Sequence, residues 1–555
     1  MAARLQRSRA RRLGRFVLMS SGSVAFVPAT GANRFLFAAH VRMPVAILRA
    51  ARRVPVPKVE RTSVLRSGAL LSSATLITAS LGLVRSKIVA LAAGPAGVGL
   101  FAQMNQLGVF LANCCSLGLG TICVKLIAEA RQLKEEDEER RMVALVLVVP
   151  AAFALIPVIL SVVAAGPMAG LLLGSSSRQA ELRISIACVP LNCLLTSISV
   201  VLLSRSRGSA LGATTIIGAV VSTCGSLALI LFAWRGVLAY TVLLTSLAPV
   251  LAALVLYPDS SLKVISWRFL PSQRYRRAIR GPAALTALGL GLSYGADTLT
   301  RGVVLHQLGP VQNGYYQPIA VLRNQLLAPL VAGIVLVLLP TISQLLKAED
   351  AVSARREVEK VWRATIIVLV PVCVAIQGLR QLYVFLAFSA EFSHSERLIL
   401  AQMPVEVLAV GVVILNAVML PAGRTTAYFL GNFLSSILQV LVSLTLLPSL
   451  GLYALVLGTG IGYATAFCIY ARSLRHSVIL PSADMWLLPA GVTISLAVFA
   501  ASTADYWFGQ ATAVITVALW PILTTTRDER RVAASRVRTM VTRLPGLKER
   551  NDAAR

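Results

Sequence analysis

The chain has 555 residues, of which 56% are hydrophobic and 14% charged, with a mean hydropathy of +0.76. This composition excludes an ordinary soluble domain, because apolar runs long enough to cross a bilayer recur along most of the sequence. The formal net charge of +30 does not indicate a nucleic-acid partner, since the basic residues collect in the terminal segments and in every second loop, without interleaved aromatic side chains.

Residues 1–64 form a basic N-terminal arm with about a dozen Arg and Lys residues and, before Glu60, no acidic residue. We expect a disordered cytoplasmic segment or an over-called start codon. An organellar transit peptide has a similar composition. Arg34 and Arg42 interrupt the apolar region of the arm and argue against a secretory signal.

The remainder predicts an all-α polytopic membrane protein with about fourteen transmembrane helices. Several of the apolar segments exceed the ~20 residues that a bilayer requires, so we expect tilt or extension beyond the hydrocarbon. The predicted spans are 66–93, 98–127, 142–165, 182–203, 210–233, 237–257, 282–308, 315–345, 364–386, 398–421, 426–448, 451–471, 485–504 and 507–525.

The loops between these spans alternate in charge. If the N-terminus lies inside, every inner connection carries Lys or Arg, whereas outer connections such as "AAGPAGVG" and "LGPVQNGYYQ" carry none. The positive-inside rule therefore predicts an even number of spans with both termini in the cytoplasm. On this topology, the basic segments 261–281 and 527–555 are a cytoplasmic linker and a cytoplasmic tail.

An internal repeat relates the two halves of the chain. "GPAGVGLF" (94–101) recurs as "GPVQNGYY" (309–316), and "TICVKLIAEA" (121–130) recurs as "TISQLLKAED" (341–350). This spacing corresponds to six spans, an even number, so the copies share one orientation and are related by an axis along the membrane normal. We predict two six-helix bundles related by a pseudo-twofold axis, at 65–260 and 282–475, followed by two additional helices at 476–526.

Charged residues inside the spans are the candidate functional residues, because a charge near the bilayer centre costs roughly 2.5–3.5 kcal/mol. Arg85 and Lys87 lie in the first span, two residues and about 200° apart around a helix, so both cannot point to one site. We expect Lys87 to face the cleft between the bundles. Arg85 is expected to snorkel or to pair with a neighbouring helix.

Further charges lie in later spans. Asp297 and Arg301 are four residues apart and share a helix face, which predicts either an intrahelical ion pair or a pair that opens when a phosphate or coupling ion arrives. Arg323 is a deep cationic candidate, and Lys125 is expected at the cytoplasmic interface. Glu406 is an isolated carboxylate that titrates, pairs with a cation, or binds Na⁺ or H⁺.

Other chemistries lack their motifs. The eight cysteines form no CxxC or Cys/His spacing, and we expect no metal and no cofactor. The chain has no Gx4GK[ST] loop, so we expect no ATP hydrolysis. No outer loop has room for a glycosyl-transfer or ligase site and no inner loop for a nucleotide-sugar domain, so we expect that the chain is not an enzyme.

Three segments resemble the polysaccharide flippases (Wzx-type O-antigen or common-antigen translocases) of the multidrug/oligosaccharidyl-lipid/polysaccharide exporter superfamily. They are "SKIVALAAGPAGVGLFAQMNQL", "GYYQPIAVL" with "VLLPTISQLL", and "FSHSERLILAQMPVEVLAV". Many members have twelve spans, so the last two spans are a departure. In the resemblance, Lys87 occupies the family's basic position before the "GP" turn, and Glu406 matches a frequent acidic position.

The resemblance implies a flippase of the bacterial inner membrane that moves undecaprenyl-diphosphate-linked O-antigen or exopolysaccharide units by alternating access. The implied partners are this lipid, the bilayer, H⁺ or Na⁺, and polysaccharide polymerase and chain-length enzymes. Alternatives are a cation-coupled multidrug exporter or a lipid II flippase of the same superfamily and, from another class, an integral-membrane polysaccharide polymerase. No outer loop is long enough for a polymerase site.

Overall fold

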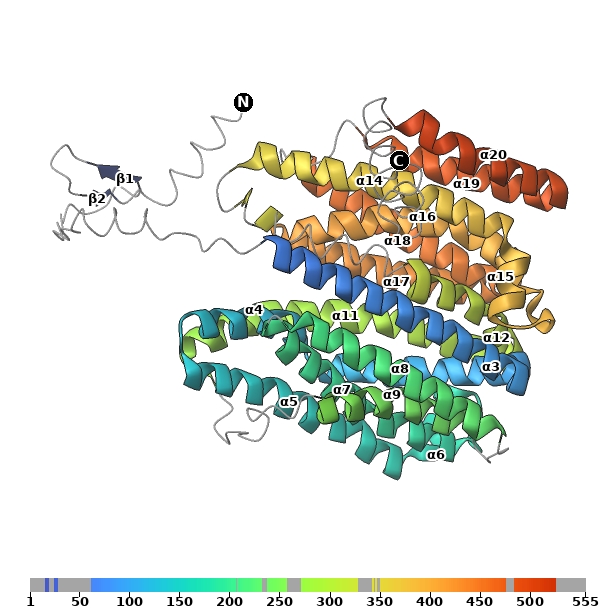
Figure 1. Ribbon diagram of the computed structural model, residues 1–555, viewed down its shortest axis with the longest axis horizontal. Coiled ribbons are helices and arrows are strands. Elements are labelled where there is room, and N and C mark those ends of the chain that lie inside the picture. The colour runs from blue at the N-terminus through green and yellow to red at the C-terminus, as the bar shows by residue number, and fades with distance from the viewer. Residues whose placement is uncertain are drawn as a thin grey trace, which may run out of the picture. The chain divides into compact units, whose positions relative to one another are not determined.

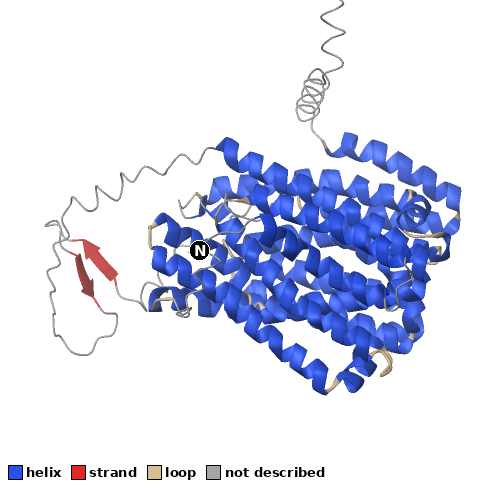
Figure 2. Ribbon diagram, turned by 60° about the horizontal axis from the view of Figure 1, so that its bottom comes forward, coloured by secondary structure: helices blue, strands red, loops and turns tan. Residues whose placement is uncertain are grey.

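The computed structural model describes residues 15–18, 24–27, 61–205, 207–231, 237–256, 271–327, 342–343, 345–346, 350–475 and 484–525. The chain divides into two compact units, 1–65 and 66–555. In the first, β1 (Arg15–Leu18) pairs with β2 (Val24–Val27) as an antiparallel hairpin, shown in red in Figure 2. The sequence analysis did not expect these strands, although "RFVL" and "VAFV" hold the aromatic and β-branched residues that favour strands. The rest of the predicted arm, and the predicted tail, lie outside the described residues.

Every described element of the second unit is helical, and each of the fourteen predicted spans overlaps at least one described helix (Figure 1). Eleven of the described helical segments are long and apolar enough to cross a membrane, and one of them, Ala74–Cys115, holds two predicted spans. The elements are α3 (Arg61–Cys115), α4 (Leu119–Gln132), α5 (Glu136–Val163), α6 (Ala165–Leu173), α7 (Gln179–Ser204), α8 (Gly208–Leu231), α9 (Val237–Leu256), α11 (Gln273–Gln307), α12 (Gly309–Val321), η1 (Leu322–Leu327), α14 (Ala351–Gly378), α15 (Arg380–Ala387), η2 (Ala390–Phe392), α16 (Ser395–Met419), α17 (Thr425–Leu450), α18 (Tyr453–Leu474), α19 (Leu487–Ala504) and α20 (Tyr506–Thr524).

Glycines set the boundaries of the first two spans. Gly94 interrupts α3 with φ 58°, a left-handed value that glycine adopts without a Cβ clash, and it separates the first span from the second. The second span does not continue to residue 127 as predicted. Helix α3 ends at Cys115, and α4 begins only after Gly118, whose φ is 65°.

Three further boundaries differ from the sequence prediction. Helix α11 begins at Gln273, inside the predicted linker, so the end of that segment is helical. The short helices α6 and α15 extend the third and ninth predicted spans as separate pieces. The predicted eighth span starts as α12 and continues as η1, a π-helical segment; residues 328–341 lie outside the described residues.

The helices of each half of the sequence pack mainly on one another. Helix α7 packs against α5 and α9, and α16 packs against α14, α18 and α19. Helix α11 contacts both halves: α4 and α6 on one side and α17 on the other. Its glycines allow the second part of α3 to approach closely, because a Cβ added at Gly295 would lie 3.2 Å from Phe110. The predicted pseudo-twofold division at 260–282 stays a prediction.

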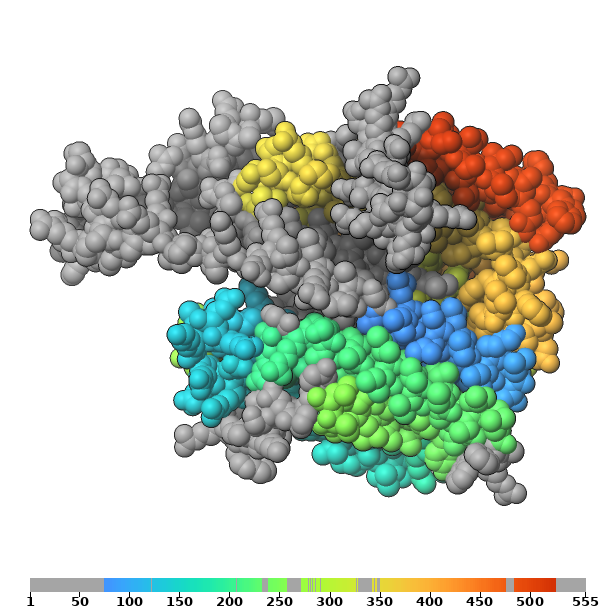
Figure 3. Space-filling view, in the orientation of Figure 1, coloured from blue at the N-terminus to red at the C-terminus, as the bar shows by residue number. Residues whose placement is uncertain are grey.

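Large apolar side chains cover much of the surface of the spans. Val163 is 80% exposed, Val255 77% and Leu231 73%. Such exposure would be unfavourable in water, whereas in a bilayer these side chains contact lipid. Figure 3 shows one face, on which α3 lies between the green surface of the N-terminal half and the orange surface near α15.

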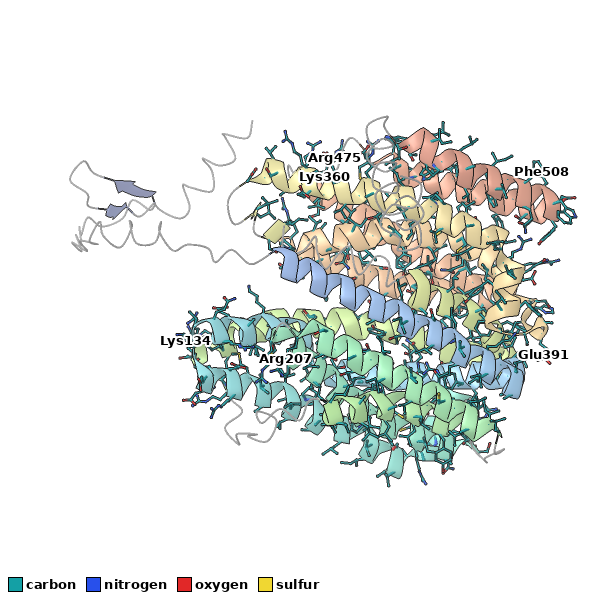
Figure 4. All side chains as sticks on the ribbon, in the orientation of Figure 1. Lys134, Arg207, Lys360, Glu391, Arg475 and Phe508 are labelled. Carbon is teal, nitrogen blue, oxygen red and sulfur yellow. The ribbon has the colours of Figure 1, made fainter. Side chains whose placement is uncertain are left out.

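The two ends of the second unit differ in their charges. Lys134 and Arg207, from predicted inner loops, lie toward one end of the helices in Figure 4, as do Lys360 and Arg475. Glu391 and Phe508, from predicted outer loops, lie at the other. This arrangement agrees with the alternation of the loops. Which end faces the cytoplasm remains a prediction.

An ion-pair network fixes the start of α11 at the predicted inner end. Tyr275 donates its hydroxyl to Oε2 of Glu135 at 2.7 Å, and Arg274 pairs with Glu129 at 3.1 Å. The backbone N–H of Ser272 donates to Oε2 of Glu138 at 2.9 Å. These contacts hold the start of α11 against the end of α4, the following loop and the first turn of α5.

Candidate functional site

Arg85 and Lys87 of the first span point to different neighbours. Nη1 of Arg85 donates to Oγ of Ser222 on α8, at 3.4 Å. Nζ of Lys87 donates to the backbone carbonyl of Phe385 on α15 and lies 5.0 Å from the centroid of its ring. The two residues therefore do not share a site, as their angular separation predicts.

Asp297 and Arg323 form an ion pair between α11 and η1. Nη2 of Arg323 lies 2.9 Å from Oδ2 of Asp297, and the other carboxylate oxygen accepts a hydrogen bond of 2.9 Å from Gln439 on α17. The exposed fraction of the side chain is 13% for Arg323 and 28% for Asp297. Arg323 occupies a π-helical turn, a deformation that is frequent at functional sites in membrane and soluble helices.

Arg301 lies one turn after Asp297 on α11 but does not pair with it as the intrahelical alternative predicted. Its Nη1 donates to Oε1 of Gln317 on α12 at 2.9 Å, and its guanidinium carbon lies 5.0 Å from the ring centroid of Tyr316. The side chain reaches α12 because Gln317 and Tyr316 present an amide acceptor and a π-face. Arg301 is only 5% exposed.

Glu406 lies on α16 and is 4% exposed. Its Oε1 accepts a hydrogen bond of 2.7 Å from Nε2 of Gln402, one turn earlier. Glu406 also interacts electrostatically with Arg323 and Asp297, as does the phenol of Tyr463 on α18. Arg301 interacts electrostatically with Asp297 and Arg323, so two guanidinium groups and two carboxylates lie near one another in the C-terminal half. We call these four residues, Asp297, Arg301, Arg323 and Glu406, the charge cluster.

Lys125 does not belong to the charge cluster. It lies exposed on α4, a helix that the structure separates from the second span. Lys87 and Arg85 also lie apart from the cluster, in contact with α15 and α8. The structure thus brings together four of the seven candidates.

Sequence reasoning missed the amides that complete the cluster. Gln317, Gln402 and Gln439 each donate to or accept from a charged residue. Each is a polar residue inside an apolar span, which is a signal that the sequence displays. Their partners, however, come from helices far apart in the chain, so only the fold identifies the pairs.

A cavity of about 490 Å³ lies elsewhere, between α15 and α20. Leu382, Phe385 and Trp507 line it, and none of its lining residues is charged. The charge cluster, and not this cavity, therefore supplies the charged groups of the candidate site. Among the described residues, no group of three or more His, Cys, Asp or Glu side chains could hold a metal ion.

The sequence profile of the family described as lipid II flippase MurJ matches residues 117–524. The chain belongs to the MurJ flippase family. This chain is also 25% identical over 409 residues to the lipid III flippase of Escherichia coli (strain K12), covering 72% of this chain and 94% of that protein. The lipid III flippase of Shigella flexneri is similar to the same extent.

Solved structures of the superfamily share the fold. The lipid II flippase MurJ in an inward closed conformation superposes with a TM-score of 0.64 at 15% identity, over 84% of this chain and 100% of that one. A multidrug resistance MATE family transporter in an inward-facing conformation gives a TM-score of 0.58 at 15% identity, over 75% and 99%. The predicted all-α polytopic fold, the exporter superfamily and the non-enzymatic transport class are confirmed. The narrower Wzx-type resemblance is not, since the family that matches is MurJ.

Proposed function

We propose that this MurJ family member flips a polyprenyl-diphosphate-linked saccharide of the lipid II type across the inner membrane. The observation that carries the proposal is the pair of guanidinium groups, Arg301 and Arg323, held inside the membrane spans at 5% residue exposure and 13% side-chain exposure. Charges at this depth are expensive and are retained for substrate or ion pathways.

Arginine suits a diphosphate headgroup, because its planar fork gives two parallel hydrogen bonds to phosphate oxygens. In the structure, one guanidinium nitrogen of Arg323 donates a hydrogen bond to Asp297. A phosphate that approaches Arg323 competes with this carboxylate, and Asp297 keeps its bond from Gln439 when the pair opens. The carboxylate of Asp297 thus balances the charge of Arg323 until a phosphate replaces it.

Glu406 and Asp297 are the proposed coupling groups. When phosphate takes the guanidinium groups, the carboxylates lose their compensating charge inside the membrane, which favours uptake of H⁺ or Na⁺. Release of that ion on the other side restores the Asp297–Arg323 pair and expels the phosphate. Differential binding of substrate and ion to the two open states supplies the direction of transport.

A drug exporter of the same fold is a weaker reading. It requires a mostly apolar binding site, such as the cavity between α15 and α20, whereas the charge cluster holds two arginines and two carboxylates. Similarity to the lipid III flippase along 94% of that protein favours a second candidate of the same chemistry, a lipid III-type glycan carrier. The O-antigen or exopolysaccharide unit inferred from the Wzx-type resemblance is a third member of this substrate class.

Complementation separates these substrates. The chain is expressed in one strain depleted of its own lipid II flippase and in another that lacks its lipid III flippase. Growth of the first strain supports the lipid II-type substrate, and restored surface glycan only in the second assigns the lipid III-type substrate. Normal membrane abundance without rescue in either strain contradicts both.

A charge-cluster variant links rescue to the proposed site. Arg323→Gln keeps a long side chain with N–H donors but removes the charge and the planar fork, so it is expected to abolish rescue. Lys360→Gln, at an exposed pair with Glu357, is the control for loss of one basic residue and is expected to rescue fully.

A further inference from the structure

The two copies of the repeated "GP" segment contact each other. Gly99 and Gly314 hold the same position in 94–101 and 309–316, as do Pro95 and Pro310. A Cβ added at Gly99 would lie 2.1 Å from the carbonyl oxygen of Pro310. A Cβ added at Gly314 would lie 1.9 Å from the carbonyl oxygen of Pro95. We call this contact the glycine crossing.

The contact is reciprocal. Each glycine meets the proline carbonyl of the other copy, as at an interface between identical surfaces related by a twofold axis. Real Cβ atoms do not approach other atoms so closely, so any residue other than glycine forces the two backbones apart. The two copies of the repeat detected in the sequence therefore also contact each other in space, as the predicted pseudo-twofold relation requires of segments on its axis.

One side chain fastens the glycine crossing. Nδ2 of Asn313 donates to the carbonyl of Gly99 at 2.8 Å, and the Asn313 side chain is fully buried. The corresponding residue in the first copy is Val98, which is 2% exposed. The backbone contact is symmetric, but the side-chain hydrogen bond from Asn313 has no counterpart in the first copy. A single hydrogen bond contributes little to holding together two residues 214 positions apart.

The glycine crossing lies at the predicted outer end of the spans. A Cβ added at Gly94 would lie 3.2 Å from Oε2 of Glu391, which Figure 4 places at the end opposite Lys134. Near it, Oγ of Ser395 donates to the carbonyl of Tyr315 at 2.7 Å and holds the second copy to α16. The second copy is therefore anchored in the C-terminal half, while Gly99 belongs to the N-terminal half.

We propose that the glycine crossing is the outer gate of the transporter, and that Gly99 and Gly314 are the residues that permit its closure. Backbones in direct contact leave no space for a headgroup to pass. When the two halves rock apart at this end of the spans, both reciprocal contacts and the Asn313 bond break together. The proposal concerns access, and it holds whichever lipid-linked saccharide is carried.

Cysteine labelling from outside tests this gate. Val98→Cys places a thiol inside the glycine crossing, and intact cells are treated with a membrane-impermeant maleimide. The thiol is expected to react slowly in this single variant, and at least about tenfold faster when Gly99→Ala or Gly314→Ala is added, because the added Cβ holds the gate open. Gly108→Ala is the matched control on α3, since its Cβ would meet only ordinary contacts at 3.6 Å or more.

Two further measurements distinguish an open gate from a disrupted fold. Without Val98→Cys, the alanine variants are expected to leave labelling of the eight native cysteines unchanged, whereas general loosening would raise it. The double variant Gly99→Ala/Gly314→Ala is expected to label no faster than the faster single one, since both residues open one contact. Equal labelling in all backgrounds overturns the gate, and labelling only in inside-out vesicles overturns its outer location.

Discussion

Nη2 of Arg323 donates a hydrogen bond of 2.9 Å to Asp297 and thereby joins the π-helical turn η1 to α11. The pair connects residues 26 positions apart, while the second carboxylate oxygen of Asp297 receives Gln439 from α17. One carboxylate thus organises three elements around a guanidinium. The stability of the C-terminal half should depend on this carboxylate.

Removing the charge of Asp297 is expected to destabilise the protein. Asp297→Asn leaves Arg323 largely buried without its carboxylate, which costs about 3 kcal/mol for a broken buried pair. The double variant Asp297→Asn/Arg323→Gln should recover part of this loss, because it removes the uncompensated charge. Thermal unfolding of the purified protein in detergent measures both.

The exposed pair Lys360–Glu357 provides the control for Asp297. Its side chains are 70% and 37% exposed, so Glu357→Gln is expected to change stability by less than about 1 kcal/mol. If Asp297→Asn were as mild as Glu357→Gln, the ion pair would not hold the cluster together.

Transport is expected to require the positive charge of Arg301, and lysine at this position should preserve only part of the transport. Arg301→Lys keeps the charge but loses the planar fork that reaches Gln317 and stacks on Tyr316, so transport should fall without being lost. Arg301→Gln should abolish transport at normal membrane abundance. Rescue of a flippase-depleted strain measures both, and full rescue by the glutamine variant would remove Arg301 from the phosphate site.

Lys87 is expected to act through the contact between α3 and α15. Lys87→Ala removes the bond to the Phe385 carbonyl and the contact with its ring, and transport should fall, whereas Lys87→Arg keeps a donor and a cation and should retain most of it. The control is Val84→Ala on the same helix, a side chain that is 50% exposed. An alanine variant that merely lowers membrane abundance would make Lys87 structural.

The charge cluster shows which contacts a sequence can predict. Helical geometry alone separated Arg85 from Lys87, because positions two apart on a helix face different ways. The same geometry placed Asp297 and Arg301 on one helix face, but it could not predict that Asp297 pairs with Arg323 instead. Arg323 and Gln439 reach Asp297 only because α11, η1 and α17 converge, and a π-helical turn has no signature in the sequence.

The fold itself was more accessible from the sequence. Hydropathy predicted fourteen spans, and each overlaps a described helix, because backbone groups in lipid must be satisfied within continuous helices. Eleven of the described helical segments are long and apolar enough to cross a membrane. The break before α4 escaped prediction, since the apolar run continues through it, and the helix is interrupted by the positive φ values of Leu117, 49°, and Gly118, 65°. The sequence alone revealed the internal repeat, whereas the reciprocal contact between Gly99 and Gly314 could be found only in the structure.

Tyr275 gives a prediction about pH. Burial and the hydrogen bond to Glu135 raise the pKa of its hydroxyl to about 12, above the value of about 10 in an unfolded chain. The folded state therefore holds this proton more tightly, and the resulting stabilisation is complete below pH ~10 and is lost as the pH rises toward 12. Tyr275→Phe removes the bond and is expected to cost about 1 kcal/mol.

The loss from Tyr275→Phe should be constant between pH ~6 and ~9, because the phenol stays protonated in both the folded and the unfolded state there. Above pH ~10 the gap between the natural protein and the variant should narrow, since only the natural protein loses the stabilisation from this proton. Tyr453→Phe removes a phenol that is 38% exposed and serves as the control. Melting temperatures across this pH range measure the effect, and a gap that widens at high pH would contradict a proton held between Tyr275 and Glu135.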